Sequence, residues 1–574
     1  MLYSIIQKRL QEAVLQVIPD ADLSLVLVRP CPDTRFGDYQ ANALMTLAKA
    51  RKMNPRQLAA DVLQKLDVSD LCEKTEVAGA GFINFKISAH AIAQQISLAA
   101  NGGPLFFEPA AAPRTVVIDF SSPNVAKPMH VGHIRSTILG DSLSRIFRLL
   151  GHSVITDNHI GDWGTQFGML LIGWKKYLDP QALASDPIFE LERIYKKVNE
   201  LAKQDETVWN EAKAELANLQ KGDAQNLGIW KQMLALSQDQ FDSIYGRLGV
   251  RFDHTLGESF YNPRLASLIQ ELKSSGIATE HEGAIKVFFD DVPQLKETPA
   301  VIQKSDGAAT YATTDLATLD YRVKTWNPQE IIYVTDGRQQ LHFKQIFTVF
   351  KKWQPLPLVL AHVWFGSILG DDGTPLKTRE GGTVKLVDLL NEAEERTLAL
   401  VKEKNPELPA ERQLEIARVV GIGAVKYADL LPNRQSDYVF SWDKMLAFNG
   451  NTGVYVQYAY TRVRSIFKKS ERHGAAAWNP ASQVVLSAPQ ELALARHLLN
   501  FGIALNGAAE EHRPNYLCNY LFELASLFSS FYESCPILDA SPAERDSRLA
   551  LSDVCAKILK QGLFLLGIET TEQM

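Results

Sequence analysis

TVVIDFSSPNVAKPMHVGHIRSTILGDS, residues 115–142, joins an apolar run to a polar turn and an amphipathic segment. The β-branched residues of 115–120 predict a buried strand, and apolar spacing from about residue 134 to 150 predicts a helix. A strand, a tight polar loop and a helix N-terminus form a geometry that binds phosphate groups, because unpaired backbone N–H groups and the helix dipole both favour an anion. The sequence therefore predicts a nucleotide site at the start of this helix.

Two histidines stand at the start of the predicted helix. His130 and His133 are three residues apart, so they lie on one face of the first turn, and both can donate to phosphate oxygens. Gly132 between them has no side chain, so a base or a sugar can lie against the backbone. Taken alone, the pair could instead be two polar residues that cap a helix.

The motif around these histidines resembles a known family. HVGH, residues 130–133, resembles the HIGH signature of class I aminoacyl-tRNA synthetases, and SSPNVAKPMHVGHIRST, residues 121–137, resembles the arginyl-tRNA synthetases of that class. The resemblance implies an ATP-dependent ligase that joins L-arginine to tRNA(Arg) through an arginyl-adenylate and releases AMP and pyrophosphate. Two alternatives stay open: another HxGH nucleotidyltransferase that acts on a small acid without RNA, and a non-catalytic, synthetase-like tRNA-binding protein.

Length and composition indicate a multidomain protein. With 574 residues the chain is too long for one core, and 46% hydrophobic with 22% charged residues is ordinary for a globular protein. The five cysteines are scattered without a CxxC pair, which argues against a disulfide framework and against protein-bound zinc and favours a cytoplasmic protein. No apolar run is long enough to span a membrane, so we expect no membrane partner. The net charge of −6 means that any RNA-binding surface is local.

The order of periodic segments predicts an α/β protein of three parts. We expect a small α+β domain over residues 1–110, with strands at 23–28 and 77–85. A Rossmann-like domain with a doubly wound parallel sheet follows over 111–410, split by a helical insertion at about 180–275. Residues 411–574 are helical in period, and the resemblance implies an all-α anticodon-binding bundle. The further sheet strands are expected at 153–156, 284–289, 300–303, 331–335 and 358–364.

A second loop carries cations beside glycines. Residues 370–386 occupy the place of the KMSKS loop of class I synthetases, but the local sequence is LKTREGG, and the second lysine of KMSKS has no clear counterpart. Arginyl-tRNA synthetases commonly show this loss, with a lysine just before HxGH thought to compensate, and Lys127 stands there. We therefore assign the pyrophosphate charge of ATP, accompanied by Mg²⁺, jointly to Lys127, Lys377 and Arg379. Each of them could also be an ordinary surface cation.

The arginine pocket is expected around an acid and an aromatic ring. A guanidinium carries five donors in a planar fork, so its site needs a carboxylate that accepts two of them. The resemblance places Tyr311 and Asp315 in this pocket, one helical turn apart, and Glu282 is a weaker second acid. Gln339 follows a predicted strand, where its amide could hold the α-ammonium and carboxylate groups. The full set assigned to arginine is Ser122, Asn124, Tyr311, Asp315, Gln339 and Glu282.

Two regions are expected to bind tRNA. The first 110 residues resemble the N-terminal domain peculiar to arginyl-tRNA synthetases, which touches the tRNA elbow, and Phe82 and Asn84 are the stacking and hydrogen-bonding candidates there. Aromatic residues interleaved with cations in the C-terminal part suit flipped-out bases, and the candidates there are Tyr455, Tyr458 and Arg462. The resemblance adds Met574, because the family also ends in methionine. Since the family is usually monomeric, the resemblance implies a monomer.

Overall fold

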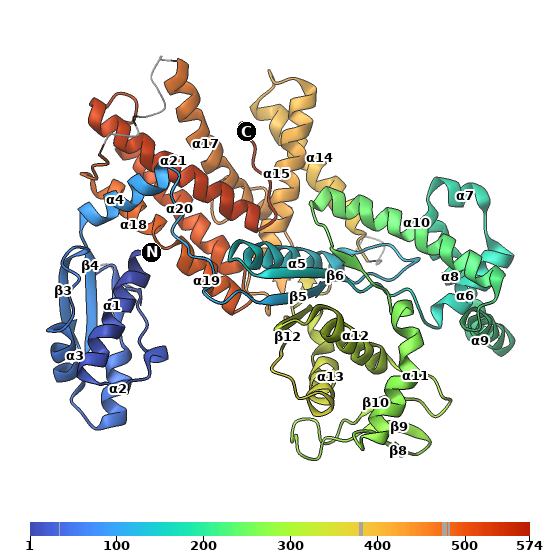
Figure 1. Ribbon diagram of the computed structural model, residues 1–574. Coiled ribbons are helices and arrows are strands. Elements are labelled where there is room, and N and C mark those ends of the chain that lie inside the picture. The colour runs from blue at the N-terminus through green and yellow to red at the C-terminus, as the bar shows by residue number, and fades with distance from the viewer. Residues whose placement is uncertain (34, 378–382, 473–478, 480–482) are drawn as a thin grey trace.

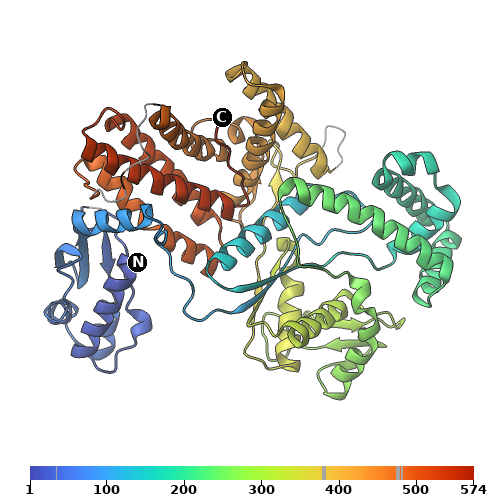
Figure 2. The ribbon, with the colours of Figure 1, turned by 45° about the horizontal axis from the view of Figure 1, so that its top comes forward.

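The computed structural model describes residues 1–33, 35–377, 383–472, 479 and 483–574. It has the three expected parts (Figure 1). A small α+β unit lies at one end of the molecule and a helical insertion at the other, with the parallel sheet between them and a helical bundle above the sheet (Figures 1 and 2). The small unit rests on the bundle, because the Tyr39 hydroxyl donates to Asn500 Oδ1 at 3.0 Å and Arg496 pairs with Asp38.

The N-terminal unit is an antiparallel sheet with helices, and two expectations for it were wrong. Residues 23–28 contain a 3₁₀ turn, Leu23–Leu25, because the Asp22 carboxylate accepts the Ser24 N–H at 3.0 Å and turns the chain. Residues 77–85 belong to a hairpin and not to one strand, since Gly79 and Gly81 both have positive φ and make its turn. The sheet order is β1-β2-β4-β3. Its elements are α1 (Leu2–Val17), β1 (Arg29–Pro30), β2 (Tyr39–Ala41), α2 (Ala43–Arg51), α3 (Pro55–Leu63), β3 (Cys72–Ala78), β4 (Phe82–Ile87) and α4 (Ala89–Ala100).

The central domain is built on a five-stranded parallel sheet of order β12-β11-β5-β6-β7. The chain moves from β5 to β6 on one side and places β11 and β12 on the other, so the winding direction reverses between β5 and β11. Ligands of doubly wound sheets bind at the carboxyl ends of strands at such a point. The strands are β5 (Thr115–Phe120), β6 (Ser153–Asn158), β7 (His254–Thr255), β11 (Glu330–Val334) and β12 (Val359–His362), and α5 (Val131–Leu149) connects β5 to β6.

The apolar runs within residues 284–303 predict further strands of this sheet, and that prediction is wrong. They form a separate antiparallel sheet of order β10-β9-β8, in which Glu282 and Gly283, both with positive φ, turn the chain from β8 into β9. A short apolar run has the same pattern in either kind of sheet. The elements of this layer are α11 (Glu258–Ser274), β8 (Thr279–His281), β9 (Ala284–Val287), β10 (Ala300–Gln303), α12 (Tyr311–Trp326) and α13 (Gln340–Trp353).

The insertion is helical, as expected, and projects from the sheet away from the N-terminal unit (Figure 2). Its core joins Met169, Ile172, Val198 and Ala212. Asp205 and Asp223 start two of its helices by accepting backbone N–H groups. The helices are α6 (Gln166–Tyr177), α7 (Pro180–Ser185), α8 (Pro187–Gln204), α9 (Glu206–Gln220) and α10 (Ala224–Leu248).

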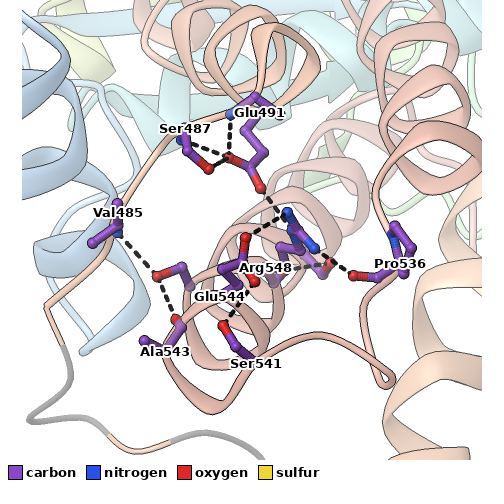
Figure 3. A network of polar contacts seen from close by, with 11 residues as sticks. Val485, Ser487, Glu491, Pro536, Ser541, Ala543, Glu544 and Arg548 are labelled. Atoms are coloured by element: carbon purple, nitrogen blue, oxygen red, sulfur yellow. Dashed lines mark hydrogen bonds and ion pairs between the residues drawn. The ribbon is translucent and has the colours of Figure 1, made fainter.

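The C-terminal part is a helical bundle whose far end is held by a buried ion pair (Figure 3). Arg548 Nε donates to Glu491 at 2.7 Å, and the same carboxylate accepts the N–H groups of Ser487 and Ala488 at the start of α18. None of the helices in the described part of the chain is long and apolar enough to cross a bilayer. The remaining elements are β13 (Ile368–Leu369), α14 (Leu386–Lys404), α15 (Ala410–Leu430), β14 (Tyr438–Val439), α16 (Trp442–Met445), α17 (Gly453–Arg472), α18 (Pro489–Leu498), α19 (Phe501–Glu510), α20 (Asn515–Ser534) and α21 (Pro542–Leu565).

Candidate active site

The loop after β5 lies at the point where the sheet reverses its winding, and its backbone is strained. Ser121, Ser122 and Ala126 have φ of 75°, 48° and 61°, in the left-handed region that residues with a Cβ rarely adopt. The structure holds Ser122 there through its N–H, which donates to Asn158 Oδ1 at 3.0 Å. Strain of this kind persists where the surroundings impose it, and it is common at ligand sites.

The two histidines are neutral, and their hydrogen bonds select one tautomer. His130 Nδ1 accepts the Gly132 N–H, and His133 Nδ1 accepts the His130 N–H, each at 3.0 Å. Burial lowers the pKa of His133 to about 3, and burial together with the Arg338 guanidinium lowers the pKa of His130. Because each Nδ1 is an acceptor, the proton of each neutral ring is on Nε2. The pair therefore presents two Nε2–H donors.

The second cation-bearing loop meets the histidine motif directly. The Val131 N–H donates to the Val384 carbonyl at 3.1 Å, the Leu386 N–H donates to the Met129 carbonyl at 2.9 Å, and His130 pairs with Lys385 in a β-bridge. Segments far apart in sequence thus form one rim. The two segments that were expected to bind one triphosphate therefore lie side by side.

The expected phosphate-binding cations have different positions around this rim. Lys377 is exposed and pairs through its backbone with Thr383. Lys127 is half-buried, three residues before His130. Arg379 lies outside the described residues.

Tyr311 and Asp315 lie on the first turns of α12, as expected. Asp315 Oδ2 accepts a hydrogen bond from His342 Nε2 at 2.5 Å, and this carboxylate raises the pKa of His342 against the effect of burial. Tyr311 is 67% exposed, so its ring is available to a ligand. The N-terminus of α12 lies beside the carboxyl ends of the strands because the helix runs antiparallel to β11.

A buried ion-pair cluster fixes α12 against the sheet. The fully buried Arg322 donates to Asp119 of β5 at 2.6 Å and to Asp157 of β6 at 2.8 Å. Breaking such a pair leaves a charge uncompensated, typically at a cost of about 3–5 kcal/mol. The cluster therefore sets the position of Asp315, two turns earlier on the same helix.

Glu258 is a site residue that the sequence analysis missed. It is the first residue of α11, and its pKa is raised to about 8 by burial and by the charges of Asp315 and Asp162. Burial and the Glu258 charge also raise the pKa of Tyr311, so the ring and the two acids form one group. Gly257 is required here, since a Cβ would come within 2.3 Å of the Asp162 carboxylate. Nothing in the local sequence distinguishes Glu258 from an ordinary first-turn acid.

The other residues assigned to arginine fall in three places. Ser122 and Asn124 are in the strained loop, where Asn124 pairs with Gly161 of the neighbouring GDWGTQFG segment. Gln339 is exposed at the start of α13, beyond the carboxyl end of β11. Glu282 is exposed at the tip of the β8–β9 hairpin, where its carboxylate contacts Lys286 and His281. These contacts give Glu282 no link to Asp315, whereas the charge of Asp315 acts on Glu258.

The candidate tRNA-binding residues lie on two units. Phe82 is half-buried on β4, whereas Asn84 is only 4% exposed, which leaves its side chain little access to a ligand. On α17, Tyr455 packs against Phe522 of α20 and is half-buried.

The remaining candidates gather near the C-terminus. Arg462 lies 5.3 Å from the ring of Tyr458 and 5.1 Å from that of Tyr532. Tyr458 and Met574 line one apolar cavity of about 440 Å³, together with Val454 and Phe448.

Comparison with known proteins agrees with this arrangement along the whole chain. The family model described as tRNA synthetases class I (R), catalytic domain, matches residues 102–442. The DALR anticodon binding domain matches residues 456–574, and the arginyl tRNA synthetase N terminal domain matches residues 3–87.

Relatives and solved structures cover the same length. The arginine–tRNA ligase of Cellvibrio japonicus is 47% identical over 562 residues, 96% of either chain. That of Chromobacterium violaceum is 44% identical over 583 residues, with full coverage of both. The arginyl-tRNA synthetase of Thermus thermophilus superposes with a TM-score of 0.87 at 26% identity, and the match covers 100% of both chains. That of Plasmodium falciparum superposes with a TM-score of 0.83 at 29% identity, and the match covers 100% of this chain and 99% of the other. The chain belongs to the arginyl-tRNA synthetase family of class I aminoacyl-tRNA synthetases.

Proposed function

We propose that this chain joins L-arginine to tRNA(Arg) in an ATP-dependent, two-step reaction at the rim where the HVGH motif meets residues 370–386. The observation that carries the proposal is the backbone pairing of Val131 with Val384, and of Met129 with Leu386. Together with the acid pair Asp315 and Glu258, it supports a triphosphate site and a guanidinium site at the carboxyl edge of one sheet.

In the first step an oxygen of the arginine carboxylate attacks the α-phosphorus of ATP, and the bond to the bridging oxygen of pyrophosphate breaks. Negative charge builds on the phosphate oxygens, which the Nε2–H groups of His130 and His133 stabilise. Lys127, Lys377 and Arg379 offset the pyrophosphate charge. No covalent protein intermediate is needed, so catalysis rests on positioning and charge stabilisation.

In the second step the 2′-hydroxyl of the terminal tRNA ribose attacks the carbonyl carbon of the arginyl-adenylate. The ester bond forms as the bond between the carbonyl carbon and the phosphate oxygen breaks, AMP leaves, and the hydroxyl proton passes to the departing phosphate or to water. This completes a balanced ligation in which ATP becomes AMP and pyrophosphate.

Arginine selection is assigned to the acid pair. The Asp315 and Glu258 carboxylates would share the guanidinium, and the exposed Tyr311 ring would form a wall. Ser122, Asn124 and Gln339 are proposed to hold the α-ammonium and carboxylate groups. Glu282 keeps no role in this arrangement, because Lys286 already offsets its charge.

The Mg²⁺ that accompanies ATP is proposed to be held mainly by phosphate oxygens. The described residues contain no group of three or more His, Cys, Asp or Glu side chains that could hold a metal ion. Magnesium commonly keeps water and substrate phosphates as most of its ligands, and it supplies charge neutralisation when bound.

The tRNA is proposed to contact both ends of the molecule. The cavity lined by Tyr458 and Met574, with Arg462 nearby, suits a flipped-out base whose phosphate meets the cation. Phe82 would stack on a base at the elbow. We further infer a cytoplasmic monomer with boundaries near residues 110 and 410, and the five unpaired cysteines support the reducing compartment.

The two alternative functions are not favoured. A nucleotidyltransferase acting without RNA leaves the matched anticodon and N-terminal domains without a purpose. A non-catalytic binding protein would not need the neutral histidine pair or the cations around it.

ATP–pyrophosphate exchange with each amino acid, with and without tRNA, tests the proposal. Arginyl-tRNA synthetases generally need tRNA for activation, so we expect exchange with arginine only when tRNA is added. Exchange driven by another amino acid, or none with arginine and tRNA together, would overturn the proposed function.

A further inference from the structure

Helix α8 of the insertion contacts two lysines beside the histidine motif. Lys127 Nζ lies 5.1 Å from the centre of the Tyr195 ring, and Lys385 Nζ lies 5.4 Å from the centre of the Phe189 ring. Lys127 precedes His130 by three residues, and Lys385 pairs with His130 in the β-bridge. The two contacts therefore place an insertion helix against both flanks of the proposed triphosphate site.

The two lysines differ from their neighbours on α8 in their ion pairing. Among the described residues, no carboxylate lies within salt-bridge distance of Lys127 or Lys385, although Lys196 and Arg193 of the same helix pair with Glu192 and Glu190. An aromatic face attracts an ammonium without neutralising it. Both lysines are half-buried near the positive end of α5, where an anion is favoured.

The rings are held in place by the structure of α8 itself. Asp186 caps the helix by accepting the Phe189 N–H at 3.0 Å, and Pro187 occupies its first turn. The buried Glu190 accepts the Asp179 N–H at 2.8 Å, which ties the first turn to the preceding segment. The Phe189 ring is 51% exposed, so its face remains open to the Lys385 ammonium.

We propose that Lys385 is a further phosphate-binding residue for ATP, and that Phe189 and Tyr195 are positioning residues that hold Lys385 and Lys127 toward the triphosphate. The inference rests on the proposed function for its substrate. It gives helix α8 of the insertion a part in binding the polyphosphate. Each ring restricts the position of its lysine ammonium, so that little rotamer freedom is lost when ATP binds.

The test compares ring-removing and ring-conserving variants. Phe189→Leu and Tyr195→Leu should each raise the KM for ATP in the exchange assay by about 2- to 5-fold, the usual strength of an exposed cation–π contact. Phe189→Tyr and Tyr195→Phe keep an aromatic ring and should have the wild-type KM for ATP. Lys385→Gln should lower kcat/KM for ATP by about 100-fold or more, as loss of a charge-stabilising donor does, and Lys385→Arg should recover most of that loss.

Lys197→Gln is the matched control, because Lys197 lies over the Tyr177 ring at 4.2 Å in the same insertion. It should leave the KM for ATP and for arginine unchanged. The inference is wrong if the ring-removing variants keep the wild-type KM for ATP, or if they raise the KM for arginine equally, which indicates general damage to the fold.

Calorimetric titration with ATP alone separates this inference from the proposed function. Weaker ATP binding in Lys385→Gln and in Phe189→Leu, with wild-type binding in Lys197→Gln, supports the inference even if arginine is not the amino acid activated. Unchanged ATP binding in both variants overturns it. Absence of arginine exchange in the wild type contradicts the proposed function alone.

Discussion

Arginine binding should release a proton from Glu258, and the Glu258→Gln variant should lose that release. With a pKa of about 8, this carboxyl is mostly protonated at neutral pH in the empty site. A guanidinium placed between Glu258 and Asp315 favours the ionised form and lowers that pKa. The ionised fraction in the empty site is about 1% at pH 6, about 9% at pH 7 and about half at pH 8.

The magnitude follows from these fractions. If arginine requires the ionised acid, its affinity should rise about tenfold from pH 6 to 7 and about fivefold from pH 7 to 8, with about 0.9 proton released per arginine at pH 7. His342, whose pKa Asp315 raises, titrates in the same direction, since its deprotonation frees the Asp315 carboxylate. The decisive quantity is therefore the difference between the wild type and Glu258→Gln in the number of protons released when arginine binds.

Isothermal titration calorimetry in two buffers of different ionisation enthalpy measures the released protons. We expect wild-type protein to release nearly one proton more than Glu258→Gln at pH 7, and we expect the pH dependence of arginine affinity to flatten in the variant. Equal proton release in the two proteins would refute the placement of the guanidinium beside Glu258.

Three further results are expected. Asp315→Ala should raise the KM for arginine at least about 100-fold, as loss of a buried charged partner does, while calorimetry shows unchanged ATP binding; intact arginine affinity would mean that the pocket lies elsewhere. Arg548→Met leaves Glu491 buried without its partner and should lower the unfolding free energy of the bundle by about 3–5 kcal/mol in thermal denaturation, with ATP binding retained; an unchanged Tm would contradict this. Nitrogen-15 NMR should show His133 as the neutral Nε2–H tautomer throughout pH 5–8, because its pKa is about 3, and protonation near pH 6 would contradict the hydrogen-bond assignment.

Local sequence patterns were sufficient to predict the structure where the residues that determine it are adjacent in the chain. The apolar run ending at Phe120, the polar turn and the helix that begins at Val131 are adjacent in sequence, so the strand, loop and helix were predictable within a few residues. The meeting of HVGH with residues 383–386 followed only from the family resemblance, because its backbone pairing joins segments far apart in the chain.

Tertiary context decided the features that local patterns could not predict. Residues 284–287 and 300–303 are strands in either topology, and only the partner strands that they meet in the fold make the pairing antiparallel. Glu258 gains its raised pKa from neighbours that arrive from other elements, so its sequence position gives no signal. The rings of α8 likewise acquire a role only because the fold carries the insertion back to the histidine motif.

A crystal structure with a bound, non-hydrolysable arginyl-adenylate analogue and pyrophosphate tests the central claim most directly. The account predicts phosphate oxygens within hydrogen-bond distance of Nε2 of His130 and His133, pyrophosphate facing Lys127 and the loop of Lys377, and the guanidinium beside Asp315. Phosphates bound away from the histidine pair, or a guanidinium outside the acid pair, would contradict it.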